Sequence, residues 1–320
     1  MIYMLGDFSN HKLWAFYAIM FSFVVTGILL NTATQFLPRD GGRAYAVDGK
    51  LSAGKPRGAG FIFIIVFAVS TALFLPINAE IAVYLILTLA AMLTGFLDDC
   101  SRSPWGEWKK GLLDLIISLM VALAIYKFGS STIFINIIGQ AITIPPVIFV
   151  ILATILAWAS INVTNCSDGV DGLSGTLSII TLMSIYSIGN LKGVNSSFQF
   201  IIITMVASVL AYLWYNATPS KMIMGDAGSR ALGLFIAIAI LKTGNPLLYI
   251  PVAFMLIIDG GLGLIKVSLI RLTKVNIMKN LRTPIHDHVR KNKGWSNTQA
   301  VFKFAIIQIV ISFVTIWFLN

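Results

Sequence analysis

Charged residues are scarce in this chain. Asp, Glu, Lys and Arg together make up 11% of its 320 residues, whereas hydrophobic residues make up 57% and the mean hydropathy is +0.86. So low a charge content excludes an ordinary soluble domain, in which about 25% of the residues are charged. The composition therefore predicts a protein that resides in a lipid bilayer.

The apolar residues gather in runs long enough to cross a membrane. A hydrocarbon core of about 30 Å needs roughly 20 apolar residues in a helix. The first run is too long for a signal-peptide core and lacks a cleavage site, so we expect it to be retained. We predict an all-α polytopic membrane protein with about ten transmembrane helices. The predicted spans are 14–36, 58–76, 80–97, 111–127, 146–162, 173–189, 198–215, 229–242, 246–270 and 300–318.

Cysteine is almost absent. Cys100 and Cys166 are the only two, and neither lies in a CxxC motif or close in sequence to a His. We therefore expect neither a disulfide nor a zinc site. Internal repeats and low-complexity segments are also lacking, and no connection between spans is long enough to fold alone. Residues 1–320 are expected to form a single integral membrane domain.

Positive charge is nearly missing from one side of the predicted topology. That side holds only Lys12, Lys127, Lys192 and Lys242, whereas the other side holds the remaining nineteen Lys and Arg residues. The positive-inside rule places the basic side in the cytoplasm, and an even number of spans then leaves both termini outside it. Since topology accounts for most of the net charge of +10, we expect no nucleic-acid partner.

Acidic residues are also few, and nearly all of the thirteen fall on the basic side. Asp98 and Asp99 end the third predicted span, Asp168 and Asp171 follow the fifth, and Asp226 precedes the eighth. Each acid alone could be a solvated helix end or the N-cap of the next helix. Three such clusters on one membrane face favour a functional site instead.

The segment NVTNCSDGVDG at 162–172 adds a polar stripe to these acids. If the fifth helix continues to Asp168, then Asn162, Asn165 and Asp168 lie on one helix face, which would be costly against lipid. The Gly after each Asp allows tight turns with exposed backbone N–H groups. This pattern suits close approach to a nucleotide or a phosphate.

Four segments together resemble the polyprenyl-phosphate N-acetylhexosamine-1-phosphate transferases, integral membrane enzymes that move a sugar phosphate from a UDP-sugar onto a lipid phosphate. The segments are FLDDCSR at 96–102, NVTNCSDGVDGL at 162–173, YNATPSKMIMGDAGSRALG at 215–233 and TPIHDHVRKNKGW at 283–295. Their order and predicted topology match the family over nearly the whole chain.

The last segment is most similar to the phospho-N-acetylmuramoyl-pentapeptide-transferase branch, which carries TPIHHH followed by Gly-Trp. Two residues and one stretch depart from that branch. Asp287 replaces the middle His, Arg102 replaces a Lys that usually follows the Asp pair, and GKPRGAG at 54–60 stands where the branch has GTPTMGG. We therefore do not expect the contacts that the Thr side chains of GTPTMGG would make.

The resemblance implies a reaction and its setting. The donor would be UDP-MurNAc-pentapeptide, the acceptor undecaprenyl phosphate, and the products UMP and lipid I, which begins peptidoglycan assembly. The protein would lie in the bacterial plasma membrane with its active site facing the cytoplasm, and it would form a homodimer. Because donor and acceptor are both anionic, the resemblance also implies Mg²⁺ as the cofactor.

The resemblance further implies roles for individual residues. Asp226 would be the principal Mg²⁺ ligand, and Asp98, Asp99 and Asp171 would coordinate, orient or accept a proton. His286 and His288 would bind phosphate oxygens or shape the sugar pocket. Residues implied to recognise the uridine and the diphosphate are Asn162, Asn165, Asp168, Gly169, Asp171 and Asn216, with Lys50 and Arg102 as further phosphate contacts. The prenyl chain would lie near 246–270, where a Gly cluster would either bend the helix or pack against a neighbour.

Two alternatives remain open at this stage. A related transferase could use UDP-GlcNAc, and the departures at Asp287 and 54–60 allow it. A proton- or ion-coupled transporter would also carry intramembrane carboxylates such as Asp114 and Asp259, although it would place them near the midplane. Within the transferase reaction, Asp98 could act either as a base in direct displacement or as a nucleophile in a two-step route.

Overall fold

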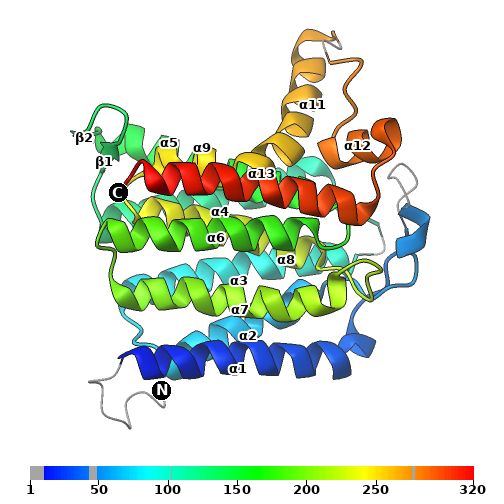
Figure 1. Cartoon of the computed structure of the whole chain (residues 1–320), viewed down its shortest axis with the longest axis horizontal. Coiled ribbons are helices and arrows are strands. Elements are labelled where there is room, and N and C mark those ends of the chain that lie inside the picture. The colour runs from blue at the N-terminus through cyan, green and yellow to red at the C-terminus, as the bar shows by residue number, and fades with distance from the viewer. Residues whose placement is uncertain (1–10, 43–48, 102, 276–277) are drawn as a thin grey trace.

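The computed structural model describes residues 11–42, 49–101, 103–275 and 278–320. Nearly all long helices run side by side along one direction, and only α11 rises away from the bundle (Figure 1). The helices are α1 (His11–Thr32), α2 (Ala59–Phe74), α3 (Ala79–Asp99), α4 (Glu107–Phe128), α5 (Pro146–Cys166), α6 (Leu173–Leu191), α7 (Ser196–Asn216), α8 (Gly225–Lys242), α9 (Tyr249–Val252), α10 (Phe254–Leu256), α11 (Leu262–Thr273), α12 (Ile285–Lys293) and α13 (Asn297–Trp317).

Each of the ten predicted spans coincides with helical structure, but not all of these helices have the length and hydropathy of an independent crossing. Among the described residues, six helices do: α1, α3, α4, α5, α7 and α13. A seventh is possible if Pro246–Val252 and Phe254–Thr273 form one bent span. The remaining helices are α2, α6 and α8, of which α2 has only 16 residues. The chain is thus a helical membrane protein.

Helix α8 lies at the centre of the bundle. It packs against α3, α5, α2 and α6, and every residue from Gly225 to Leu241 is buried. Protein surrounds it on all sides, so polar side chains such as Asp226 and Arg230 meet protein partners and not lipid. This explains why α8 is less apolar than a helix that faces the bilayer.

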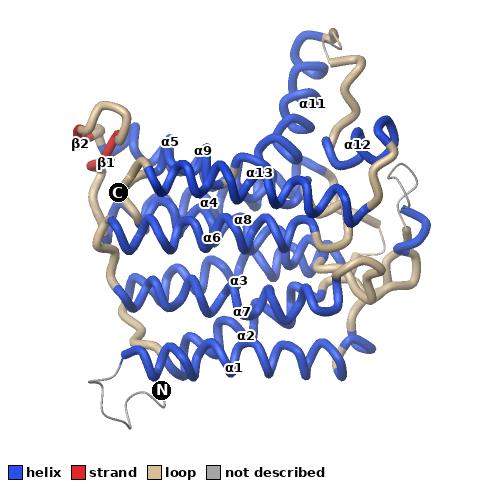
Figure 2. Tube along the Cα trace, in the orientation of Figure 1, coloured by secondary structure: helices blue, strands red, loops and turns tan. Residues whose placement is uncertain are grey.

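The prediction of an all-α chain missed one hairpin. Strands β1 (Thr132–Ile135) and β2 (Gln140–Thr143) pair antiparallel, with Thr132 opposite Thr143. The hairpin lies at the end of the bundle where α13 ends, far from α12 (Figure 2). Each strand has only four residues, which is too short for a clear alternating pattern in the sequence.

The bend expected near the Gly cluster is present, but its sharpest point comes earlier. The two helical parts Pro246–Val252 and Phe254–Thr273 meet at 73°. Pro251 lies next to this break and has no N–H to donate. The Gly cluster itself forms a π-helical turn at Ile257–Gly261, and a Cβ on Gly260 would lie 2.1 Å from the Val163 carbonyl oxygen. The close packing expected of the cluster is therefore found, whereas the 73° bend lies at the break before it.

The loops that carry the predicted site meet at one end of the bundle. The segment before α2 is fixed there, since the N–H groups of Ala59 and Gly60 donate to the carbonyls of Ile223 and Met224 at 3.1 and 3.0 Å. Helices α3 and α5 end, and α4, α8 and α12 begin, at the same end (Figure 1). Five segments that are distant in sequence are thus brought together.

Candidate active site

Asp99 joins α3 to the start of α8. Its two carboxylate oxygens accept hydrogen bonds from the N–H groups of Asp226 and Ala227 at 3.1 and 3.0 Å. Gly225 has a φ of +70°, and a Cβ there would lie 2.2 Å from Asp99 Oδ2, so only glycine fits. Asp99 therefore caps α8, whereas Asp226 lies in the first turn with its side chain free for other contacts.

A lysine bridges the other two carboxylates of this cluster. Lys110 Nζ, from α4, lies 2.5 Å from Asp98 Oδ2 and 3.0 Å from Asp226 Oδ2. The second oxygen of Asp98 accepts a hydrogen bond from the Trp105 N–H at 2.7 Å. Both oxygens of Asp98 are thus engaged, and its charge is directed at the same cation as that of Asp226.

Arg57 approaches the same cluster from the loop before α2. Its Nε lies 2.8 Å from Asp99 Oδ1, and its two Nη atoms lie 3.6 Å from Asp226 Oδ1 and Asp40 Oδ1. Burial alone would lower the pKa of Arg57, but the charges of Asp99, Asp226 and Asp40 outweigh it and raise the pKa. The guanidinium is therefore a permanent cation between three carboxylates.

Sequence reasoning missed Arg57, Lys55 and Lys110 as site residues, because it counted them only as basic loop charges. The departure of GKPRGAG from GTPTMGG was a usable signal, since it replaces two Thr by Lys55 and Arg57. The structure places both new cations at the acidic cluster or its neighbouring cavity. The substitution therefore adds positive charge where anionic substrates would bind.

The carboxylates fit a divalent cation of the magnesium type. Among the described residues, no group of three or more His, Cys, Asp and Glu side chains has the arrangement of a complete metal site. Asp98 and Asp226, however, already share one cation, the Lys110 ammonium. Mg²⁺ in phosphoryl-transfer sites usually takes only one or two carboxylates and completes its shell with water and substrate phosphates. The donor set suits such an ion.

A cavity of about 360 Å³ is lined in part by Lys55, from the loop that carries Arg57. Its lining includes four predicted residues and three unpredicted ones: Asp168, Gly169, Asp171 and Asn216, and Lys55, Ser220 and Arg290. Lys55 Nζ donates to Ser220 Oγ at 2.8 Å and lies 3.8 Å from Asp171 Oδ2. Asp171 in turn accepts from the Ser220 N–H at 3.0 Å. Lys55 and Arg57 thus connect the cavity to the acidic cluster.

The predicted asparagines have different environments. Asn216 uses both ends of its amide within the protein, accepting from the Gly172 N–H and donating to the Met222 carbonyl, each at 2.8 Å. Asn165 donates to Ser229 Oγ at 2.9 Å. Asn162 donates to the Trp158 carbonyl within its own helix and does not line the cavity. The helix α5 ends at Cys166, so the polar stripe does not continue to Asp168 as a helical face.

The two histidines of α12 are held by different groups. His286 is buried. Its backbone N–H donates to Asp259 Oδ1 at 2.7 Å, and its ring Nδ1 lies 2.8 Å from Asp259 Oδ2. His288 Nδ1 instead accepts from the Arg282 N–H at 3.3 Å. Asp287, the replacement for the middle His of TPIHHH, lies 3.4 Å from Arg290. Lys50 has its side chain outside the described residues, and Arg102 lies outside them altogether.

Gly169 is in direct contact with His286. A Cβ added to Gly169 would lie 2.3 Å from His286 Nε2. With Nδ1 hydrogen-bonded to Asp259, the ring cannot retreat without losing that bond. The DG motif at 168–169 and the TPIHDH segment are therefore parts of one site, although they are more than a hundred residues apart.

The variant Gly169→Ala is expected to lower the turnover of this site by about 10 to 100-fold, because a displacement of the His286 ring by an ångström or more disturbs the groups around it. The measurement is kcat/KM of the purified protein. Gly111→Ala is the matched control, since no atom lies within 4 Å of an added Cβ there. Equal activity of the two variants would show that His286 tolerates displacement.

Comparison with known proteins gives a consistent result. Residues 81–244 match the sequence model of glycosyl transferase family 4. A phospho-N-acetylmuramoyl-pentapeptide-transferase of Treponema pallidum (strain Nichols) is 36% identical, over 91% of this chain and 85% of its own length. A protein of the same name from Clostridium perfringens (strain SM101 / Type A) is 30% identical, over 93% of this chain and 94% of its own length. Another, from a Wolbachia of Brugia malayi (strain TRS), is 28% identical, over 75% of this chain and 77% of its own length.

Proposed function

The chain belongs to glycosyl transferase family 4, and we propose that it transfers phospho-MurNAc-pentapeptide from UDP-MurNAc-pentapeptide to undecaprenyl phosphate, forming lipid I and UMP. The relatives named above carry this activity in their names. The observation that supports it most is the acidic cluster of Asp98, Asp99 and Asp226, which is bridged by Lys110 and Arg57 and adjoins a polar cavity.

The cluster and the cavity suit the two halves of the donor. Asp168, Gly169, Asp171 and Asn216 line the cavity and are proposed to hold the uridine. Lys55 also lines that cavity, two residues before Arg57 of the acidic cluster, and the diphosphate would extend along it. Its ammonium is a compact positive charge that can bind phosphate oxygens. Along the site, a polar cavity is followed by cations and then by carboxylates. This order matches the uridine, the diphosphate and a metal ion at the reacting β-phosphate.

We propose that Mg²⁺ is held by Asp226 and Asp98. When bound, it would neutralise charge on the diphosphate and polarise the β-phosphoryl group. Lys110 and Arg57 would then shift from bridging carboxylates to contacting phosphate oxygens. These two residues stabilise the extra negative charge that develops as the bond to the leaving group breaks.

The reaction proposed is a displacement at the β-phosphorus. An oxygen of the lipid phosphate forms a bond to that phosphorus, and the bond to the oxygen bridging the α- and β-phosphorus breaks. UMP leaves with the electron pair. In this proposal Asp98 holds Mg²⁺ with one oxygen and accepts the Trp105 N–H with the other, which favours an orienting role over attack by Asp98 itself.

The setting is proposed as follows. Ten helical crossings, with α2, α6 and α8 counted among them, would place the acidic cluster at the cytoplasmic end and both termini at the other. Helix α1 begins, and helix α13 finishes, on the side of the bundle opposite the acidic cluster (Figure 1). This placement supports an even number of crossings. A homodimer in the bacterial plasma membrane remains a prediction, which the mass of the purified protein in detergent would test.

The donor is tested by UMP release from purified protein in lipid nanodiscs that contain undecaprenyl phosphate. We expect release with UDP-MurNAc-pentapeptide and at least about 100-fold lower kcat/KM with UDP-GlcNAc, because the second donor lacks the groups that a dedicated site would contact. A preference for UDP-GlcNAc would contradict the proposed donor. No release with either would contradict the proposed reaction.

The variant Arg57→Ala is expected to lower kcat/KM by about 100-fold, since it removes a cation from the site of charge development and leaves Asp99 and Asp226 less compensated. Arg57→Lys should recover part of this loss, because it keeps the charge but not the fork geometry. Arg39→Ala, an exposed arginine of the same loop, is the matched control and should keep the wild-type rate. Equal rates for all three variants would exclude Arg57 from the site.

A further inference from the structure

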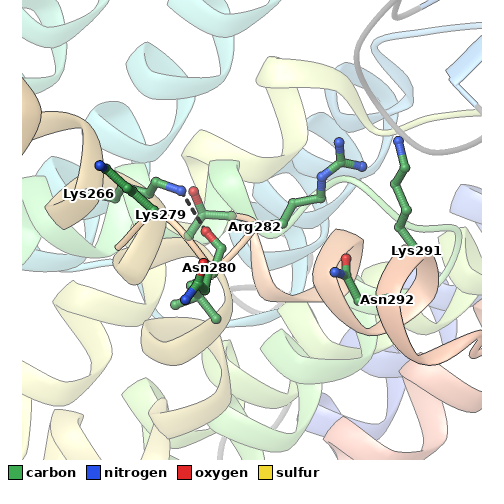
Figure 3. A pocket seen from close by; sticks show the side chains of 8 residues that line it. Lys266, Lys279, Asn280, Arg282, Lys291 and Asn292 are labelled. Carbon is green, nitrogen blue, oxygen red and sulfur yellow. Dashed lines mark hydrogen bonds between the residues drawn. The ribbon is translucent and has the colours of Figure 1, made fainter. Parts of the chain in front are cut away.

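A second hollow lies beside the candidate active site, between α11 and α12. Its volume is about 590 Å³. The polar side chains that line it are Lys266, Lys279, Asn280, Arg282, Thr283, Lys291 and Asn292. Figure 3 shows Lys266 and Lys279 on one side, Lys291 and Asn292 on the other, and Arg282 between them. No acidic side chain is among the lining residues that the structure describes.

The cations of this hollow have no acidic partner among the residues that the structure describes. Within the described part of the chain, no carboxylate oxygen lies within 4.0 Å of Lys266, Lys279, Arg282 or Lys291. Lys266 is fixed by a hydrogen bond to the Leu281 carbonyl at 2.6 Å, and Lys279 and Lys291 are exposed. Four like charges around one space repel each other unless an anion joins them. The hollow therefore has the chemistry of an anion site.

The helix α12 separates this hollow from the donor cavity. Arg290 lines the donor cavity, whereas the next residue, Lys291, lines the hollow. Successive residues of a helix point about 100° apart, so the two spaces lie against different faces of the same helix. The helix also carries His286, which contacts Gly169 of the donor cavity. A donor bound in the cavity would therefore lie one helix away from the four cations.

The length of a pentapeptide matches this separation. Five extended residues span at most about 17 Å, and a helix with its side chains is about 10–12 Å wide. A peptide linked through its N-terminus to the sugar keeps its C-terminal carboxylate free at the far end. We infer that the hollow of Lys266, Lys279, Arg282 and Lys291 binds the carboxylate end of the donor's peptide. This inference rests on the proposed function.

The hollow gives the site a means of distinguishing donors. A UDP-sugar without a peptide places no carboxylate there, so it gains nothing from the four cations. The contact is distant from the phosphorus that reacts and has the same strength before and during the reaction. It should therefore affect KM and leave kcat nearly unchanged.

The test compares two donors on three proteins and on a fourth, neutral variant. The donors are UDP-MurNAc-pentapeptide and the same compound with its peptide carboxylates converted to amides. The proteins are the wild type, the charge-reversed double variant Lys279→Glu/Lys291→Glu and the control Lys293→Glu, an exposed lysine of α12 that does not line the hollow. The KM of the neutral double variant Lys279→Gln/Lys291→Gln for the acidic donor should lie between those of the wild type and the charge-reversed protein. Lys266 is left unchanged because it holds the Leu281 carbonyl.

We expect amidation to raise KM about tenfold in the wild type and in the control, and to have little effect on, or to lower, the KM of the charge-reversed variant. The charge-reversed variant should also show a KM about tenfold higher for the acidic donor, with kcat within about twofold of the wild type. The same amidation effect in all proteins would overturn the inference while leaving the proposed function intact. No UMP release by the wild type would overturn both.

The assays are run in nanodiscs of neutral lipid and again with anionic phospholipid added. Added anionic lipid should not change the ratio of the KM values for the two donors. If the variants differ from the wild type only when anionic lipid is present, and equally with both donors, the hollow holds a lipid headgroup and the peptide assignment is wrong.

Discussion

Replacement of Asp226 by asparagine is expected to lower the rate of UMP release by about 10³-fold, with the fold preserved. The amide has the shape of the carboxylate but no charge. It would leave Lys110 and Arg57, which lie 3.0 and 3.6 Å from the Asp226 oxygens, with one fewer negative partner. It would also remove the principal proposed ligand of Mg²⁺, and loss of one group that stabilises transition-state charge commonly costs 10²–10³-fold.

The control for Asp226→Asn is Glu107→Gln. Glu107 starts α4 on the same side of the bundle, but its side chain is 73% exposed and pairs with Arg271, away from the cluster. Its loss should change the rate by less than about twofold. The rates are initial velocities at saturating donor, with thermal unfolding measured on the same preparations. An Asp226→Asn protein that turns over at the wild-type rate would exclude the carboxylate from the chemistry.

Replacement of Arg230 by methionine is expected to give the largest loss of stability. Arg230 on α8 is 1% exposed and Asp114 on α4 is 2% exposed. The Arg230 Nε donates to Asp114 Oδ1 at 3.0 Å, and a second nitrogen of the guanidinium contacts the same oxygen. The variant would leave the Asp114 carboxylate buried without its cation, and the free energy of unfolding should fall by about 3–5 kcal/mol.

The double variant Arg230→Met/Asp114→Leu should recover most of that loss, because two apolar side chains of similar volume need no charge partner. Arg271→Met, which breaks an exposed pair, should lower the free energy of unfolding by at most about 1 kcal/mol. The measurement is equilibrium unfolding in detergent micelles. A single Arg230→Met variant as stable as the double variant would mean that Asp114 is not a buried charge.

The sequence predicted the positions of the long helices well, because a long apolar run indicates a membrane-crossing helix. It also predicted which acids would share one face. Asp98, Asp99 and Asp226 do meet, and Asp168, Gly169 and Asp171 line a cavity close by. Topology alone gives this result, since all of these residues lie at helix ends on the same side of the bundle.

Pairings between segments could not be predicted in this way. Asp99 caps α8, and Lys110 and Arg57 bridge the carboxylates, through contacts that depend on how α2, α3, α4 and α8 pack. The two deep acids that suggested a transporter also have specific partners, Arg230 for Asp114 and His286 for Asp259. A charge count cannot tell a cation that bridges carboxylates from one that only sets the topology, because both appear as basic residues on the same side of the predicted topology.

The most direct test of the account is the Mg²⁺ dependence of UMP release by the purified protein, supplied with UDP-MurNAc-pentapeptide and undecaprenyl phosphate. The initial rate should rise with Mg²⁺ to saturation, fall to background when the ion is chelated, and return when Mg²⁺ is restored in excess. A full rate in the chelated protein would contradict the claim that Asp98 and Asp226 hold a metal ion for phosphoryl transfer.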